Sequence, residues 1–289
     1  MTTDYTFAVF IITHGRAGHV TTDIALKRQG FTGRIIYVVD DLDEQLPEYQ
    51  KLYGTDAVKV FSKSQVVKSF DIADTKTDTR SSCYARNAAN IMAEELKLDY
   101  FLVLDDDYMG FRFRYGSRNK LHALLCSNLD NLFAAMLRLL IATNADAVAL
   151  AQGGDFIGGT KSKMWKDGIK RKAMNSWFLT TKRPVTFLGR LNEDVNAYLV
   201  HGAVGKLFLS VTQATLDQKR TQQQAGGLSE AYLDSGTYQK SFYSVLYAPS
   251  CVKVRPMFHA FGGTRYHHHI TWEHAVPKII NERHRKVGK

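Results

Sequence analysis

Three consecutive carboxylates, Asp105, Asp106 and Asp107, are the residues of this sequence best suited to chemistry. They directly follow residues 100–104, an unbroken apolar run that predicts a strand buried on both faces of a mostly parallel sheet. Ligands of open α/β sheets gather at the carboxyl ends of such strands. Adjacent like charges repel one another, and a hard cation such as Mg²⁺ or Mn²⁺ would offset that cost. The stretch alone predicts either a metal site or a solvated acidic turn.

Two further groups of polar residues follow later in the chain. Glu193 and Asp194 occupy a segment, GRLNEDVN, that reads as a polar turn before an apolar run. The histidines His267 and His268 belong to RYHHHI, which predicts a strand whose side chains alternate between faces. One imidazole could complete a ligand set begun by the aspartates, and the alternative is a purely structural histidine.

The first turn of the chain predicts a possible nucleotide contact. The sequence HGRAG follows the first strand but has only two glycines, so it does not match the dinucleotide fingerprint G-x-G-x-x-G. It could still bring backbone close to a nucleotide, with Thr13 and Arg16 as contacts. Asp40, at the end of the second strand, could bind a base or ribose, and Arg86, in the first turn of a later helix, could clamp an anion. The alternatives are an ordinary loop at Thr13 and Arg16, a solvated acid at Asp40, and a surface Arg–Asn pair at Arg86.

Hydrophobic periodicity predicts the elements that must position these residues. Strands are expected at residues 6–13, 34–39, 57–61, 100–104, 111–115, 146–150, 176–180 and 185–188, and one or two more within 241–256. Helices are expected at residues 19–29, 43–53, 81–98 and 119–143, and polar surface segments at 71–80, 151–175 and 219–239. Strands that alternate with helices favour an α/β fold with a mostly parallel sheet flanked by helices.

Basic residues suggest a polyanionic partner. The formal net charge is +10, from 38 Lys and Arg against 28 Asp and Glu, which favours nucleic acid, a phosphorylated ligand or an anionic surface. The expected strand at residues 111–115 alternates aromatic residues with Arg112 and Arg114, which could lie along a phosphate backbone or stack on bases. Later in the chain, the glycine- and lysine-rich segment 151–175 predicts a loop that closes on a phosphate-bearing ligand. The candidate contacts in that loop are Lys163, Trp165, Lys170, Arg171 and Lys172. An amphipathic strand and a solvated loop are the alternatives.

Length and composition fit a soluble protein with one large α/β domain, or with one domain and a substantial appendage. The chain has 289 residues, of which 45% are hydrophobic and 23% charged. Its three cysteines are widely spaced, which argues against a disulfide framework or a zinc site and fits a reducing compartment. The N-terminus lacks the features of a signal peptide, and no apolar run reaches membrane-spanning length. We therefore expect a cytoplasmic protein.

Three motifs in order resemble a GT-A glycosyltransferase. They are SSCYARNAAN at residues 81–90, FLVLDDD at residues 101–107 and NED at residues 192–194. The first resembles the family's helix with an "ARN" start, the second its DxD strand and the third its catalytic "ED" motif. The C-terminal sequences RYHHHITW and VPKII resemble the phage and TET/JBP-associated branch, which glycosylates hydroxymethylated pyrimidines in DNA.

The resemblance implies a role for each candidate residue. Asp107 would bind Mn²⁺ or Mg²⁺, Asp105 would reach the ribose or the metal, and the run of three aspartates leaves the DxD register open. Asp194 would be the general base beside Glu193. The remaining expected donor and metal contacts are Thr13, Arg16, Asp40, Arg86, Asp106, His267 and His268.

The fold implied by the resemblance is a single GT-A, Rossmann-like domain over residues 1–289. Residues 1–110 would form the nucleotide-sugar half, and residues 111–289 the acceptor half with a smaller C-terminal extension. The implied reaction moves a sugar, most simply glucose from UDP-glucose, to 5-hydroxymethylcytosine in double-stranded DNA. The alternatives are a polysaccharide, lipid-carrier or protein acceptor, and a catalytically inactive nucleic-acid-binding protein on the same scaffold.

Overall fold

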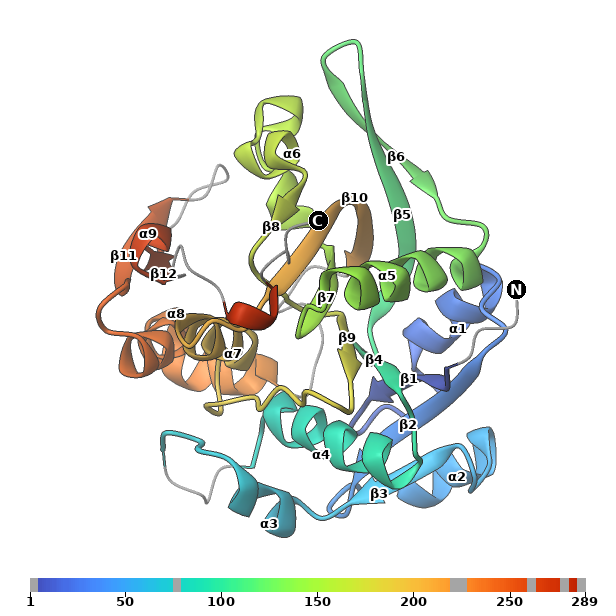
Figure 1. The fold of residues 1–289 in the computed structure, drawn as a ribbon. Helices are drawn as coiled ribbons and strands as arrows, with labels where there is room; N and C mark the ends of the chain where they lie inside the picture. The colour runs from blue at the N-terminus through green and yellow to red at the C-terminus, as the bar shows by residue number, and fades with distance from the viewer. Residues whose placement is uncertain (1–4, 75–78, 219–227, 259–263, 276–280, 285–289) are drawn as a thin grey trace.

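A large mixed sheet organises the molecule (Figure 1). The computed structural model describes residues 5–74, 79–218, 228–258, 264–275 and 281–284. Within these ranges one sheet has ten strands, with the order β3-β2-β1-β4-β9-β7-β10-β5-β6 and β8 paired to β10. Strands β3, β2, β1, β4, β7, β10 and β6 run in one direction, whereas β9, β5 and β8 run against them. The predicted α/β fold with a mixed, mostly parallel sheet is confirmed.

The described residues form two sheets and a set of helices. The large sheet contains β1 (Phe7–Ile12), β2 (Arg34–Asp40), β3 (Val58–Phe61), β4 (Tyr100–Asp105), β5 (Tyr108–Ser117), β6 (Lys120–Leu125), β7 (Ala147–Ala151), β8 (Ile169–Lys170), β9 (Trp177–Thr180) and β10 (Phe208–Gln218). The helices are α1 (Thr21–Arg28), α2 (Leu46–Tyr53), α3 (Lys63–Val66), α4 (Ser82–Glu95), α5 (Leu129–Thr143), α6 (Lys163–Asp167), α7 (Glu193–Ala203), α8 (Leu228–Tyr247) and α9 (Trp272–Ala275). A second sheet pairs β11 (Val252–Phe258) with β12 (Thr264–Ile270).

Strand β4 lies inside the sheet and is covered on both faces. Phe101 and Val103 belong to the hydrophobic cluster on the side of α4, whereas Leu102 and Leu104 belong to the cluster on the side of α1 and α5. All four side chains are fully buried, and each such burial is worth about 1.5–3 kcal/mol. The apolar run therefore fixes β4 firmly, and with it the position of the carboxylates that follow.

The predicted helix over residues 119–143 is wrong in its first part. Residues Lys120–Leu125 form β6, which pairs with β5 through a two-residue loop at Arg118 and Asn119. Both loop residues have positive φ, the conformation that a tight hairpin requires. The helix α5 begins only after Asn128, whose side chain accepts a hydrogen bond from the Asn131 N–H.

Other connections also differ from the prediction. The segment 151–175 is built from the 3₁₀ turns η2 (Gly153–Phe156) and η3 (Gly159–Lys161), then α6 and β8, around a small apolar cluster. Helix α8 occupies much of the stretch predicted as a polar excursion and strands, and residues 219–227 lie outside the described ranges. The RYHHHI strand is confirmed as β12, while the VPKII sequence at residues 276–280 is not described.

Residues 185–188, predicted as a strand, are irregular because side chains from α4 bind their backbone. Asn87 donates to Phe187 O at 2.9 Å and accepts from Phe187 N at 3.0 Å, and it also donates to Cys83 O. Asn90 donates to Val185 O at 2.9 Å. These bonds replace the strand partners that the backbone would otherwise need.

Replacing Asn87 with alanine should destabilise the protein by about 2–4 kcal/mol, because it leaves the buried N–H and C=O of Phe187 unpaired. Asn90→Ala removes a single bond and should cost about 1 kcal/mol. Urea unfolding of the two variants tests this difference, provided that the slope with denaturant is unchanged. Equal losses for the two variants would show that Asn87 does not tether this segment.

Candidate active site

The three aspartates lie at the carboxyl edge of the sheet, as the sequence predicts. Asp105 ends β4 and is in register with Ile12, the last residue of β1. Asp106 and Asp107 form the turn into β5. The acidic cluster therefore adjoins the turn that follows β1, at the edge where ligands of parallel sheets gather.

Asp106 turns back toward the loop after β1. Its Oδ2 accepts a hydrogen bond from the Thr13 hydroxyl at 2.7 Å, and its Oδ1 lies 2.6 Å from Arg16 Nη1. The Tyr49 hydroxyl contacts both ends of the same loop, at Thr13 Oγ1 and at Arg16 N. The Asp106 carboxylate therefore holds the HGRAG loop against the end of β4. Thr13 and Arg16, expected at the donor, are the residues that it holds.

Asp105 points toward helix α4. Its Oδ1 accepts a hydrogen bond from Arg86 Nη2 at 2.9 Å, and its Oδ2 accepts one from the Tyr108 hydroxyl at 2.9 Å. Burial raises the pKa of Asp105 to about 6, although the positive charge of Arg86 opposes that rise. The negative charge of Asp107 raises it further. Asp105 is thus a half-buried carboxylate that Arg86 and Tyr108 hold beside the charge of Asp107.

Of the three aspartates, Asp107 is the one whose carboxylate is best able to bind a cation. Its Oδ1 is buried and has no hydrogen-bond partner within the described residues. Burial raises the pKa of its carboxyl, the charge of Asp106 adds to that rise, and a hydrogen bond from Gln218 opposes it. A buried carboxylate oxygen without a partner is costly unless something binds it.

Arg86 links this cluster to the predicted Glu-Asp pair. Its Nε lies 3.3 Å from Glu193 Oε1 and 3.6 Å from Asp194 Oδ1, while Nη2 binds Asp105. Arg86 is only 2% exposed, so three carboxylates surround one buried guanidinium. The two acidic motifs, 86 residues apart between Asp107 and Glu193 in the sequence, therefore form one site. Whether Arg86 also contacts a donor stays a prediction.

The Glu-Asp pair lies in the first turn of a helix and not in the predicted turn. Helix α7 begins at Glu193, after Asn192 with a φ of 61°. Acidic residues stabilise a helix at its N-terminus through the helix dipole. The apolar run that follows packs this helix into the core, since Val195 and Leu199 are both buried.

Both carboxylates of the pair are held firmly. Asp194 Oδ1 accepts a hydrogen bond from Trp177 Nε1 at 3.0 Å, and Oδ2 accepts one from Asn175 N at 3.0 Å. Burial raises the pKa of Asp194 to about 6, against the opposing charge of Arg86. Glu193 accepts a hydrogen bond from the Ser82 hydroxyl. A carboxyl whose pKa is near 6 is able to exchange a proton close to neutral pH.

The histidine strand approaches the site through Asn192. The amide of Asn192 lies 3.1 Å from His268 Nδ1, immediately before the Glu-Asp pair. Burial and the nearby charges of His267 and two lysines lower the pKa of His268 to about 3, so its imidazole is neutral. His267 is exposed, with Nδ1 2.7 Å from the His268 carbonyl oxygen. The role of either histidine as a metal ligand stays a prediction.

The carboxylates of this site fit a divalent cation whose coordination is completed by a bound phosphate-containing molecule. Among the described residues, no three His, Cys, Asp or Glu side chains gather into a preformed metal cluster. In the described part of the chain, five carboxylates nevertheless share the site with two guanidinium groups. The carboxylates are Asp105, Asp106, Asp107, Glu193 and Asp194, and the guanidinium groups are Arg16 and Arg86. Mg²⁺-type ions are commonly held by one or two carboxylates together with phosphate oxygens and water.

Asp40, predicted to contact a base or ribose, is paired within the chain. His14 Nδ1 lies 2.6 Å from Asp40 Oδ2, and Lys63 Nζ lies 3.0 Å from Oδ1. Burial alone would raise the pKa of Asp40, but these two partners outweigh it and lower the pKa. Neither His14 nor Lys63 stands out in the sequence, since only the fold brings Lys63 from α3 to the end of β2.

Several basic residues expected at the acceptor are neutralised within the chain. The ion pairs are Arg112 with Asp217, Lys170 with Asp167 and Lys172 with Asp155. The Arg114 guanidinium lies over the Phe156 ring at 4.8 Å, and Trp165 packs against the same small apolar cluster. Lys163 is exposed and Arg171 is half-buried. Acceptor contacts by these residues stay predictions.

Comparisons with known proteins place the chain in a family. No curated protein matches it. Among solved structures, glucosyl-3-phosphoglycerate synthase from Mycobacterium tuberculosis with Mn²⁺, UDP and glucosyl-3-phosphoglycerate has 10% identity and a TM-score of 0.47, over 96% of this chain and 89% of that one. Residues 1–349 of S. aureus TarS with UDP-GlcNAc have 13% identity and a TM-score of 0.47, over 85% of this chain and 67% of that one.

No helix in the described ranges is both long and apolar enough to cross a membrane.

The model of one protein family, described as TET-associated glycosyltransferase, matches residues 7–227. That match spans the β4 carboxylates, Arg86 and the Glu-Asp pair, and it covers most of the chain. The chain therefore belongs to the TET-associated glycosyltransferase family.

Proposed function

We propose that this protein is a metal-dependent GT-A glycosyltransferase that moves a sugar, glucose in the simplest case, from a UDP-sugar to a hydroxymethylated pyrimidine in DNA. The observation that carries the proposal is the single acidic site in which Arg86 joins Asp105 to Glu193 and Asp194. Family membership and the charge of +10 support a nucleic-acid acceptor, with 5-hydroxymethylcytosine as the first substrate to test.

The orientation of the aspartates supports a DxD register of Asp105 and Asp107. Asp106 faces Thr13 and Arg16, whereas Asp107 keeps a buried oxygen free of partners among the described residues. Asp105 and Asp107 would hold Mn²⁺ or Mg²⁺ together with the donor diphosphate. When bound, the cation would offset the negative charge that develops on the leaving phosphate.

Asp194 would act as the general base on the acceptor hydroxyl. The hydrogen bonds from Trp177 and Asn175 fix its carboxylate, and Arg86 favours its ionised form. Removing the hydroxyl proton strengthens the acceptor oxygen as a nucleophile while the bond between the sugar and the diphosphate breaks. A pyrimidine in duplex DNA would have to leave the base stack, which costs a few kcal/mol.

A UDP-release assay with Mn²⁺ and UDP-glucose tests this function. Three duplexes of one sequence are compared, carrying 5-hydroxymethylcytosine, 5-methylcytosine or cytosine at one position. Release that requires the hydroxymethyl group supports the proposal. UDP release only with a polysaccharide, lipid-carrier or protein acceptor would show that the enzyme acts on another class of acceptor. DNA binding without UDP release would favour a catalytically inactive nucleic-acid-binding protein.

A further inference from the structure

The β5–β6 hairpin projects from the sheet beyond the other elements (Figure 1). Its strands pair from Arg112↔Leu125 to Ser117↔Lys120 and close in the tight loop at Arg118 and Asn119. The hairpin exposes large apolar and aromatic side chains, including Phe113 and Tyr115, each 42% exposed. Residues 108–125 contain four Lys or Arg and no Asp or Glu. The element is thus an exposed two-stranded ribbon whose own charged side chains are all basic, and of these Arg112 pairs with Asp217 of β10.

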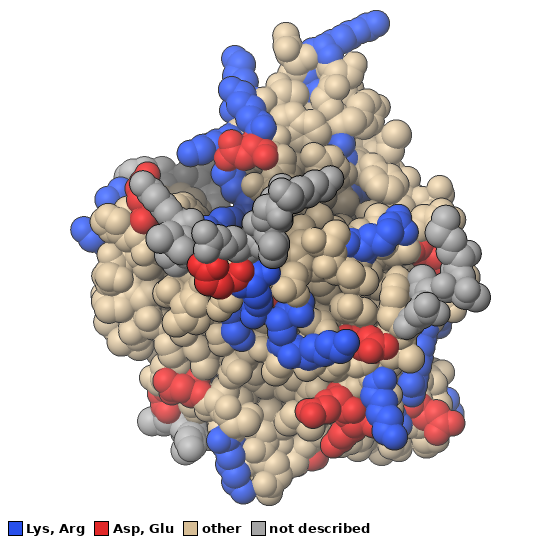
Figure 2. Space-filling model, in the orientation of Figure 1, with Lys and Arg blue, Asp and Glu red and all other residues tan. Residues whose placement is uncertain are grey.

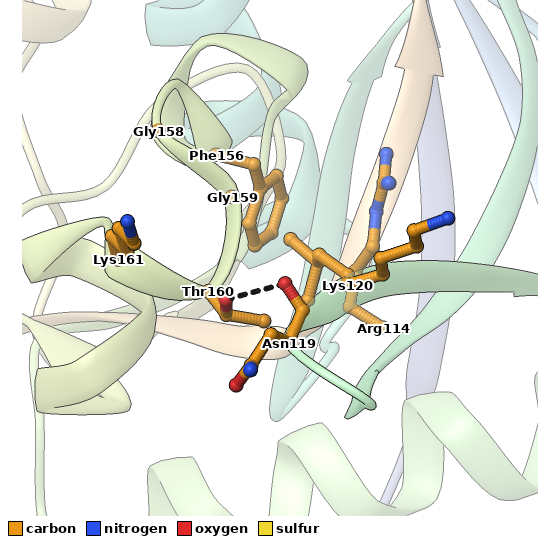
Figure 3. A pocket seen from close by; sticks show the side chains of 9 residues that line it. Arg114, Asn119, Lys120, Phe156, Gly158, Gly159, Thr160 and Lys161 are labelled. Carbon is orange, nitrogen blue, oxygen red and sulfur yellow. Dashed lines mark hydrogen bonds between the residues drawn. The ribbon is translucent and has the colours of Figure 1, made fainter.

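A recess of about 500 Å³ opens between the hairpin tip and the η2–η3 segment (Figure 3). The tip contributes Arg114, Asn119 and Lys120, and the opposite wall contributes Lys161 and the stretch Gly158–Thr160. A hydrogen bond of 3.0 Å from the Thr160 hydroxyl to Asn119 O fixes the two walls to each other. The recess is therefore a defined feature of the fold.

The chemistry of the recess suits an anion. None of the nine residues that line it is acidic, and three of them are cations, Arg114, Lys120 and Lys161. Arg114 is held over the Phe156 ring, and its Nε is buried without a hydrogen-bond partner in the described part of the chain. Lys120 and Lys161 are exposed at the rim. Figure 2 shows Lys and Arg side chains projecting at this end of the molecule.

The position of the recess relates it to the acidic site. Arg114 is six residues along β5 from Tyr108, which adjoins the aspartates, so the recess lies about 20 Å from them. That separation is too large for the recess to hold the sugar or the reacting base. It equals about six base-pair steps along a duplex.

We propose that this recess binds a backbone phosphate of the duplex DNA acceptor, with the basic hairpin lying along the DNA. The inference rests on the proposed function, since it assumes a DNA acceptor. The contact is independent of base sequence, and it fixes the register of the duplex so that the modified pyrimidine reaches the acidic site. Charge complementarity identifies the occupant, because hairpin residues 108–125 and the nine residues that line the recess include Lys and Arg but no Asp or Glu.

The test is a double charge reversal at the rim, Lys120→Glu with Lys161→Glu, measured by fluorescence anisotropy with a 5-hydroxymethylcytosine duplex. DNA affinity at about 0.1 M salt should fall about tenfold or more, and the slope of log affinity against log salt should flatten by about one. UDP affinity with Mn²⁺ should remain as in the wild type, because the recess is remote from the aspartates. The matched control is Arg34→Glu with Lys51→Glu, two exposed cations on β2 and α2 that should leave both affinities unchanged apart from the small effect of net charge.

The outcomes separate this inference from the proposed function. A loss of DNA affinity in the recess variant but not in the control variant supports the recess as a phosphate site. If the wild type glucosylates DNA but the recess variant binds DNA as well as the control does, the recess is not the phosphate site and the proposed function stands. If the wild type neither binds nor glucosylates DNA, the DNA acceptor and the recess assignment fail together.

Discussion

Replacing Asp107 with alanine is expected to abolish Mn²⁺-dependent binding of the UDP-sugar and to lower kcat/KM by about a thousandfold. The buried Oδ1 of Asp107 has no partner among the described residues, so this carboxylate is the one best placed to bind a cation. A thousandfold loss corresponds to about 4 kcal/mol, within the range that a metal contributes to charge stabilisation. Calorimetric titration with UDP, with and without Mn²⁺, measures the binding part of the effect.

Asp106→Asn is the matched control for this prediction. It alters the neighbouring carboxylate, which is bound to Thr13 and Arg16, and so it should loosen the loop after β1. We expect lower thermal stability, with Mn²⁺-dependent UDP binding retained. The reverse pattern, in which Asp106→Asn abolishes the metal dependence and Asp107→Ala does not, would overturn the DxD register of Asp105 and Asp107.

Asp194→Asn should lower kcat by a factor of about 10²–10⁴ and leave the KM for the UDP-sugar nearly unchanged. The substitution removes the proton acceptor while keeping the size of the side chain. An amide accepts through one oxygen only, so one of the bonds from Trp177 and Asn175 is lost, at a cost of about 1–3 kcal/mol in stability. Turnover should therefore be measured well below the melting midpoint of the variant.

The pH dependence of the wild type and the variant Glu193→Gln complete this test. Because burial raises the pKa of Asp194 to about 6, its active, ionised form is lost as the pH falls through that value, and kcat at saturating metal should fall with it. Glu193 is held by Ser82 and Arg86, so Glu193→Gln should reduce kcat much less. An equal loss in both variants, or an acid limb that persists unchanged in Asp194→Asn, would exclude Asp194 as the base.

The sheet could be predicted because its strands are fixed by local patterns. Strand β4 is uninterrupted apolar sequence and is buried on both faces, and its carboxylates end up at the predicted edge. Helix α4 begins where the predicted helix 81–98 begins, after Ser81, whose hydroxyl accepts a hydrogen bond from Cys83 N. Where burial and capping agree along one short stretch, the sequence is sufficient.

Two predicted elements, the strand at residues 185–188 and the first part of the helix at residues 119–143, were wrong because contacts with other elements override local propensity. Residues 185–188 have strand-like composition, but Asn87 and Asn90 from α4 bind their backbone. The Leu-rich residues 120–125 have helical propensity, yet the turn at Arg118 and Asn119 pairs them with β5. The positive φ of those two residues is visible only in the folded chain, because Arg-Asn is not one of the dipeptides that mark a tight hairpin in a sequence.

Within the site, the sequence could predict the residue types but not their orientations. That Asp106 faces the loop after β1 while Asp107 keeps an unpaired oxygen follows from the turn into β5. The role of Arg86 as the common partner of both acidic motifs depends on how α4 and α7 meet. A DxD pattern carries no information of that kind, because three adjacent aspartates are equivalent until the chain folds.

The most direct test of the central claim is the binding of Mn²⁺ followed by electron paramagnetic resonance, in which the signal of free Mn²⁺ disappears when the ion is bound. The wild type with UDP should take up one Mn²⁺ per chain, and Asp107→Ala with UDP should take up none beyond the binding to UDP itself. Equal uptake by the wild type and a folded Asp107→Ala variant would contradict a cation held at the end of β4.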